Sequence, residues 1–145
     1  MNKARIEKAI AIMRRAEEHD SLFMPFWQLD PNNRALPFVT TEHELHACGN
    51  RACFAGHIAV SPEFQEDGGC RGQEGEPVFN EHSGSDAIRE WLGISDAQAC
   101  QLVFGDATGI PPCYPDDSEY YGKAFGDVTA RDVIAKLEQL LEQTK

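Results

Sequence analysis

The chain has few basic residues and lacks several motifs that depend on them. It carries 13 lysines and arginines against 24 aspartates and glutamates, a formal net charge of −11, and so lacks the basic footprint of a nucleic-acid-binding protein. No lysine occurs between Lys8 and Lys123 and no G-K-[ST] sequence is present, which excludes a P-loop for phosphate. Its five cysteines are odd in number, which argues against a disulfide framework, and they include no C-x-x-C pair, which argues against a thioredoxin-like redox pair.

A long apolar run is also missing. No stretch approaches the roughly 18 residues that span a bilayer, and the N-terminus begins with a charged amphipathic pattern instead of a secretory signal. We therefore expect a cytoplasmic protein that does not bind membranes. With 41% hydrophobic and 26% charged residues, the chain suits a single domain, residues 1–145, around one core.

The charge is distributed unevenly along the chain. Residues 1–15 hold five basic side chains and one acidic one, whereas the other 130 residues hold eight basic and 23 acidic ones. Such an asymmetry indicates attraction toward a basic partner surface. The alternative is an acidic surface that serves solubility alone.

Hydrophobic periodicity predicts an all-α domain of about five helices. Apolar residues recur at helical spacing in five ranges, the third of which begins at either Ser83 or Ser85: 3–18, 51–60, 83–93, 95–104 and 129–143. Ser95 and Gln98 have the spacing of a capping box at the start of the fourth helix. Residues 66–85 and 105–127 lack periodicity and are expected to form two long loops, with a short hairpin as the alternative in 66–82.

The most unusual stretch is HELHACGNRACFAGH, residues 43–57, which contains three of the five histidines and two of the five cysteines. A metal site here would use the following residues: His46, Cys48, Cys53 and His57. Cys53 and His57 are four residues apart, so one helical face can present both. The spacing nevertheless matches neither a zinc finger nor a C-x2-C ribbon, and Ala47 stands where an H-E-x-x-H motif needs histidine.

A structural role explains more of these residues. The segment RACFAGHIAV has little polar surface on any side, which is typical of a buried helix. Its small residues allow close packing, Gly49 supplies an unusual backbone angle, and His57 is expected to be a core histidine with a hydrogen-bonded ring nitrogen. We therefore expect no metal, no cofactor and no catalytic residue, and a structural box made of Cys48, Gly49, Cys53, Ala55, Gly56 and His57.

This box resembles the C-G-x-x-x-C-x-A-G-[WH]-x-A motif of small uncharacterised proteins from tailed phages, prophages and some bacteria. Weaker similarity continues in EWLGISDAQACQLVFG and DVTARDVIAKLEQL, so that the likeness covers about residues 22–141. The resemblance implies an accessory protein of a mobile element. Related boxes have tryptophan at the position of His57, which implies that no metal ligand is required there.

The composition predicts a non-enzymatic protein-binding module, such as an inhibitor of a host-defence or nucleic-acid-handling factor whose basic surface the acidic protein would occupy. Residues 109–125 combine prolines, tyrosines and carboxylates in the manner of a recognition surface, and the contacts expected there are Tyr114, Asp116, Asp117 and Tyr120. One alternative is a zinc- or thiol-dependent protein that uses Cys48, Cys53 and His57. Another is a homo-oligomer, for example a homodimer, in which the helix of residues 3–18 or 129–143 packs against its copy.

Overall fold

The computed structural model describes residues 1–22, 28, 30–32, 41–46, 49–104, 119–120, 123–124 and 128–143. Within these ranges the chain forms seven helices: α1 (Lys3–His19), α2 (Glu42–His46), α3 (Phe54–Val60), α4 (Pro62–Glu66), α5 (Ser85–Leu92), α6 (Asp96–Phe104) and α7 (Ala130–Glu142). Five short strands accompany them: β1 (Cys70–Arg71), β2 (Pro77–Phe79), β3 (His82–Ser83), β4 (Glu119–Tyr120) and β5 (Lys123–Ala124). The fold is therefore mainly helical, and the all-α prediction is corrected by these strands.

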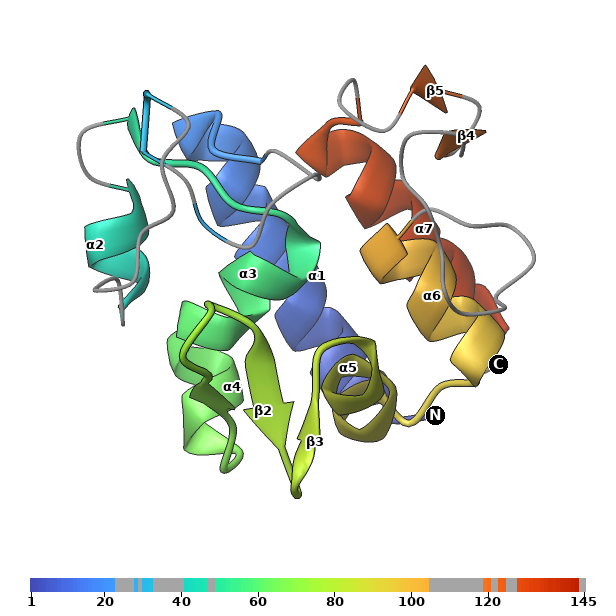
Figure 1. Cartoon of the computed structure of the whole chain (residues 1–145). Helices are drawn as coiled ribbons and strands as arrows, with labels where there is room; N and C mark the ends of the chain where they lie inside the picture. Colours follow the sequence, from blue (N-terminus) through green and yellow to red (C-terminus); the bar gives the residue numbers. More distant parts are fainter. Residues whose placement is uncertain are drawn as a thin grey trace.

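The helices α1 and α7 pack along each other and build the centre of the core (Figure 1). The apolar stripe expected in each is buried, and the residues involved are Ile6, Ala9, Ile10, Ile12, Met13 and Ala16 of α1 and Val133, Ile134, Leu137 and Leu140 of α7. A capping box begins α7, in which the Thr129 hydroxyl accepts from the Asp132 amide and Asp132 accepts from the Thr129 amide. None of the described helices is long and apolar enough to cross a bilayer.

The helices α5 and α6 follow the predicted boundaries closely. Gly93 ends α5 in the left-handed conformation at φ +67°, where glycine carries no steric penalty. The Ser95 hydroxyl accepts from the Gln98 amide at 3.2 Å, while the Gln98 side chain accepts from the Ser95 amide at 2.9 Å. The capping box predicted from the sequence is therefore present at the start of α6.

Residues 66–85 do not form the long loop that we expected. The strands β1, β2 and β3 form an antiparallel sheet in which Cys70 pairs with Val78 and Val78 with Ser83, so the hairpin alternative was closer. Phe79 explains this departure, because its side chain is buried and its ring packs 5.9 Å from that of Phe64 in α4. The second expected loop is also corrected, since β4 and β5 pair within it.

Helix α3 is buried along its whole length and contacts α1, α4, β1 and β2. It begins at Phe54, three residues later than predicted, because Cys53 is extended and caps the helix. Ala52 forms a parallel bridge with Leu22 directly after α1. This bridge brings the end of α1 beside the start of α3, and the candidate site lies at that junction.

Candidate functional site

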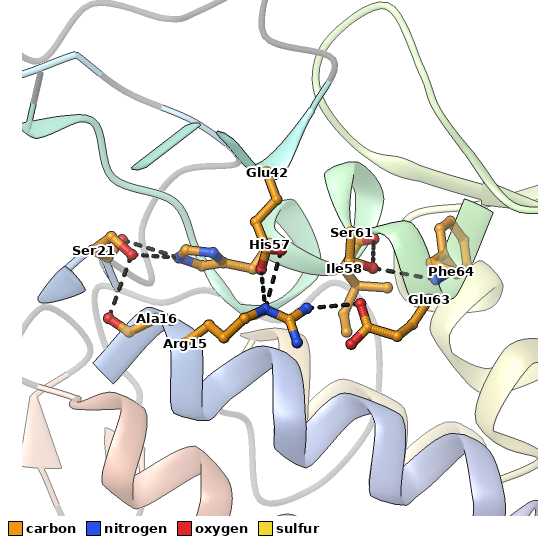
Figure 2. Close-up of polar contacts among 9 residues, drawn as sticks. All are labelled: Arg15, Ala16, Ser21, Glu42, His57, Ile58, Ser61, Glu63 and Phe64. Atoms are coloured by element: carbon orange, nitrogen blue, oxygen red, sulfur yellow. Dashed lines mark hydrogen bonds and ion pairs between the residues drawn. The ribbon is translucent and has the colours of Figure 1, made fainter. Parts of the chain in front are cut away.

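The side chain of His57 is held at the junction of α1 and α3. The imidazole is fully buried, and its Nε2 lies 3.0 Å from the backbone carbonyl oxygen of Ser21. A carbonyl oxygen can only accept, so Nε2 carries the proton and donates. Figure 2 shows the ring facing Ser21. This arrangement is the one expected of a core histidine, yet the second ring nitrogen, Nδ1, is buried without a hydrogen-bond partner.

Two further histidines extend this contact toward the surface. The His46 ring of α2 lies 5.7 Å from the His57 ring, and the exposed His19 at the end of α1 stacks on His46 at 4.1 Å. The pKa of His57 is lowered to about 3 and that of His46 to about 4, mainly by burial and in smaller part by neighbouring positive groups, while the hydrogen bond to Ser21 opposes the shift of His57. Both rings are therefore neutral at neutral pH.

An ion-pair network surrounds Arg15 beside the histidines. Its guanidinium donates to Glu42 of α2 at 2.9 Å and to Glu63 of α4 at 2.7 Å, so that Arg15 joins three helices (Figure 2). Burial acts to lower the pKa of Arg15, but the hydrogen bonds to Glu63 and Glu42 outweigh it and raise the pKa above its ordinary value. The positive charge of Arg15 is thus held and balanced by two carboxylates.

The thiol of Cys53 has a structural role. Its Sγ accepts a hydrogen bond from the Gly56 amide at 3.2 Å and so caps α3. Burial raises the pKa of the Cys53 thiol to about 12, which keeps it protonated at neutral pH. A buried neutral thiol is a poor nucleophile and a poor metal ligand, and this geometry argues against the thiol-dependent alternative.

Of the other residues of the box, Ala55 and Gly56 lie in the core, whereas Gly49 is exposed. Gly49 takes the left-handed angle, φ +75°, that we expected of it. Ala55 and Gly56 are buried in α3, where the Gly56 carbonyl accepts from the side-chain amide of Gln28 at 3.0 Å. Cys48 lies outside the described residues. In the part of the chain that is described, no group of three or more His, Cys, Asp or Glu side chains is arranged to hold a metal ion.

The predicted contact residues for a partner are not brought together in the described ranges. Tyr114, Asp116 and Asp117 lie outside them, and Tyr120 belongs to β4 without a described side chain. Sequence reasoning also missed His19, Ser21 and Arg15 as parts of the site. His19 and Arg15 lie on the polar side of α1, where the sequence pattern gives no sign of a tertiary contact, and a backbone carbonyl such as that of Ser21 leaves no sequence signal at all.

A second polar cluster forms near the opposite end of α1. Asp67 accepts from the indole Nε1 of Trp91 at 2.9 Å and from Lys8 at 3.0 Å, and Arg5 lies 3.3 Å away. Burial acts to raise the pKa of Asp67, but the Trp91 and Lys8 hydrogen bonds and the charges of Lys8 and Arg5 lower it below its ordinary value. We call these four residues the Asp67 cluster.

Comparisons of the chain with protein-family models, with curated proteins and with solved structures find no match. The resemblance of the Cys–His box to phage proteins therefore stays a prediction.

Proposed function

We propose that this protein is a non-enzymatic, cytoplasmic binding module that recognises a basic protein partner through a carboxylate-rich surface. The observation that carries the proposal is that four of the five lysines and arginines of α1, the most basic part of the chain, form ion pairs within the fold. Their charge is therefore not available to offset the acidic surface elsewhere.

The pairing of these cations is extensive. Arg5 and Lys8 contact Asp67, Arg15 contacts Glu42 and Glu63, and Arg14 lies 3.7 Å from Glu138 of α7. Most of the positive charge of the N-terminal segment is therefore paired with carboxylates of the same protein. What a partner meets is predominantly negative.

Among the described residues, carboxylates are frequent around α4 and the three-stranded sheet. Residues 61–100 contain nine carboxylates and two arginines. Of the described carboxylate side chains in this region, three are exposed and take part in no ion pair: Glu66, Glu74 and Glu81. Glu66 ends α4, and Glu74 and Glu81 lie in the turns of the sheet beside it (Figure 1). The Phe64 ring of α4 packs on Phe79 of this sheet. We call the three glutamates the acidic trio.

Apolar docking has less support than charge recognition. Met1 is the only large hydrophobic side chain that is exposed among the described residues. The apolar faces of α1 and α7, which the homo-oligomer alternative needs, are buried against each other and the core. A charged surface gives fast, salt-dependent association with an oppositely charged partner. A host-defence or nucleic-acid-handling protein, whose basic surface binds phosphate, is the partner class that fits.

Capture from bacterial lysate tests the proposal, with two charge-reversal variants as the comparison. Glu66→Lys/Glu74→Lys/Glu81→Lys inverts the acidic trio, whereas Glu7→Lys/Glu18→Lys adds positive charge on exposed positions of α1. We expect wild type and the α1 variant to retain a basic partner at physiological salt and the trio variant to lose it. Failure of wild type to retain any partner, or undiminished retention by the trio variant, would contradict the proposal.

The contact set Tyr114, Asp116, Asp117 and Tyr120 stays a prediction that the same assay can score. Tyr120→Ala and Asp116→Lys are expected to melt like wild type and to capture less partner. If both capture the partner undiminished, this segment is not the binding surface.

A further inference from the structure

Two ring nitrogens at the histidine junction are buried without a hydrogen-bond partner among the described residues, namely Nδ1 of His57 and Nε2 of His46. Buried polar atoms in proteins are almost always hydrogen-bonded, so each exception needs an explanation. Here the two exceptions lie on neighbouring rings, whose centroids are 5.7 Å apart. Their proximity indicates one common cause.

The tautomer of His57 is the second observation. Its Nε2–H donates to the Ser21 carbonyl, which leaves Nδ1 unprotonated with an open lone pair. A histidine that binds a metal ion typically donates its other ring N–H to a carbonyl or carboxylate, which fixes the ring and its tautomer. The Ser21 carbonyl gives His57 this arrangement, and the same carbonyl also accepts from the Ala52 amide at 2.9 Å, so its position is fixed by the backbone.

We propose that His57 Nδ1 and His46 Nε2 together bind one divalent transition-metal ion of the kind that prefers imidazole, such as Zn²⁺, with water completing its coordination. With Zn–N bonds of about 2.0–2.1 Å, two imidazoles on one ion have ring centroids roughly 5–6.5 Å apart, and the observed separation of 5.7 Å falls in this range. This site differs from the one considered from the sequence, because Cys53 caps α3 instead of facing a ligand. It is independent of the proposed partner binding.

The surroundings of the two rings are compatible with a cation. Arg15 is the nearby positive group, and its charge is balanced by Glu42 and Glu63 at 2.9 and 2.7 Å. The exposed His19 ring stacks at 4.1 Å and 25° on His46, so it covers that ring from the solvent side.

Metal titration of the chelator-treated full chain tests the proposal. We expect Zn²⁺ to bind with one-to-one stoichiometry in calorimetry, and His46→Gln to weaken this binding at least roughly tenfold. The matched control is His43→Gln, an exposed histidine on the same helix, which should bind like wild type. His46 is only partly buried, so His46→Gln is expected to fold, whereas a substitution of the fully buried His57 is expected to destabilise the core. A thermal melt checks this.

Nitrogen-15 NMR of the histidine rings supplies a second readout. We expect His57 to be the Nε2–H tautomer and its Nδ1 resonance to shift on addition of one equivalent of Zn²⁺, while the His43 and His82 rings stay unchanged. Absence of one-to-one binding in wild type would overturn the proposal. Binding that His46→Gln leaves intact, or Zn²⁺ that shifts His43 or His82 in place of His57, would overturn it as well.

Discussion

The two ends of α1 carry polar clusters of opposite character. At the Asp67 cluster, near the N-terminal end, the carboxylate accepts from Trp91 and Lys8 and pairs with Arg5. At the C-terminal end, the rings of His46 and His57 each retain a buried nitrogen without a partner. The carboxylate of the first cluster is hydrogen-bonded within the protein, whereas each ring of the second has a nitrogen without a hydrogen-bond partner among the described residues.

This difference separates a structural cluster from a candidate binding site. A buried polar group whose hydrogen bonds are all made within the protein holds structural elements together and needs no ligand. A buried lone pair without a partner lowers stability, so its presence in a packed core points to a ligand that the protein alone does not supply. The following four predictions test the contrast, from the largest expected effect to the smallest.

Acidification should weaken the histidine end first. Both rings are neutral in the folded protein, with pKa values of about 3 for His57 and about 4 for His46, whereas in the unfolded chain they become charged below about pH 6.5. The unfolded state therefore binds more protons between pH 6.5 and 4, and stability falls as the pH falls through that window. We expect His57 alone to give a loss on the order of 3 kcal/mol by pH 4. The partly exposed His46 adds a smaller loss, and urea unfolding of the metal-free protein measures both.

Two variants assign that loss to the buried rings. His46→Gln removes one of the two titrating groups and should reduce the fall between pH 6.5 and 4, while His43→Gln on the same helix should leave it unchanged. Because the pKa of Asp67 is lowered, its contribution to the free energy of unfolding is lost only at lower pH. The pH dependence of stability therefore distinguishes the two ends of α1. A free energy of unfolding that is flat from pH 6.5 to 4 would remove the histidine explanation.

Asp67→Ala should disrupt the Asp67 cluster, in which every polar group is paired. The substitution leaves the Trp91 indole N–H without its acceptor and Lys8 and Arg5 without their shared carboxylate. We expect a loss of about 1–3 kcal/mol, the usual range for a buried donor left unsatisfied. The control is Glu66→Ala, an exposed neighbour whose change should stay within about 0.5 kcal/mol. Equal effects of the two substitutions in denaturant titration would mean that the cluster is not structural.

Gly56→Leu tests whether the histidine end is tightly packed despite its unpartnered nitrogens. Gly56 is buried in α3 and uses both of its backbone groups, toward Cys53 and Gln28. A larger side chain should cost about 1–3 kcal/mol through overpacking. Ala97→Leu places the same side chain on an exposed position of α6 and serves as the matched control. If the thermal melt of Gly56→Leu equals that of wild type, Gly56 does not face a packed neighbour.

Ser95→Ala provides a reference remote from both clusters. It removes the hydroxyl that accepts from the Gln98 amide at the start of α6, and a lost N-cap costs about 1 kcal/mol. Ser95→Asp keeps an acceptor and should remain close to wild type in the same denaturant titration. A loss as large as that of Asp67→Ala would show that the clusters on α1 contribute no more than an ordinary helix cap.

Much of the helical fold could be predicted because its signals are local. The stripes of α1 and α7, the capping box at Ser95 and the ending of α5 at Gly93 all depend on residues a few positions apart. The helices α2 and α4 have five residues and the strands two or three, which is too short for a hydrophobic period to be recognised. Tertiary contacts, such as Phe79 against Phe64, stabilise these elements, and a local pattern cannot show such contacts.

The candidate site was predictable only in part. The sequence drew attention to His46, Cys53 and His57, and it gave His57 a hydrogen-bonded place in the core. It could not show that Cys53 turns to the Gly56 amide, or that His19 and Ser21, more than 20 residues before His46, complete the surroundings. These relations come from the junction of α1 with α3, and no spacing along the chain encodes them.

The bridge between Leu22 and Ala52 brings together the two ends of the segment of residues 23–51. Loop-closure entropy grows only with the logarithm of length, so that doubling such a segment costs about 0.6 kcal/mol. The fold is consequently almost indifferent to how many residues lie between the two bridge positions. His46 belongs to this segment and His57 to the core, so an ion bound by both would be a second cross-link between them. The affinity of that ion would then depend on the length of the segment, whereas the stability of the core would not.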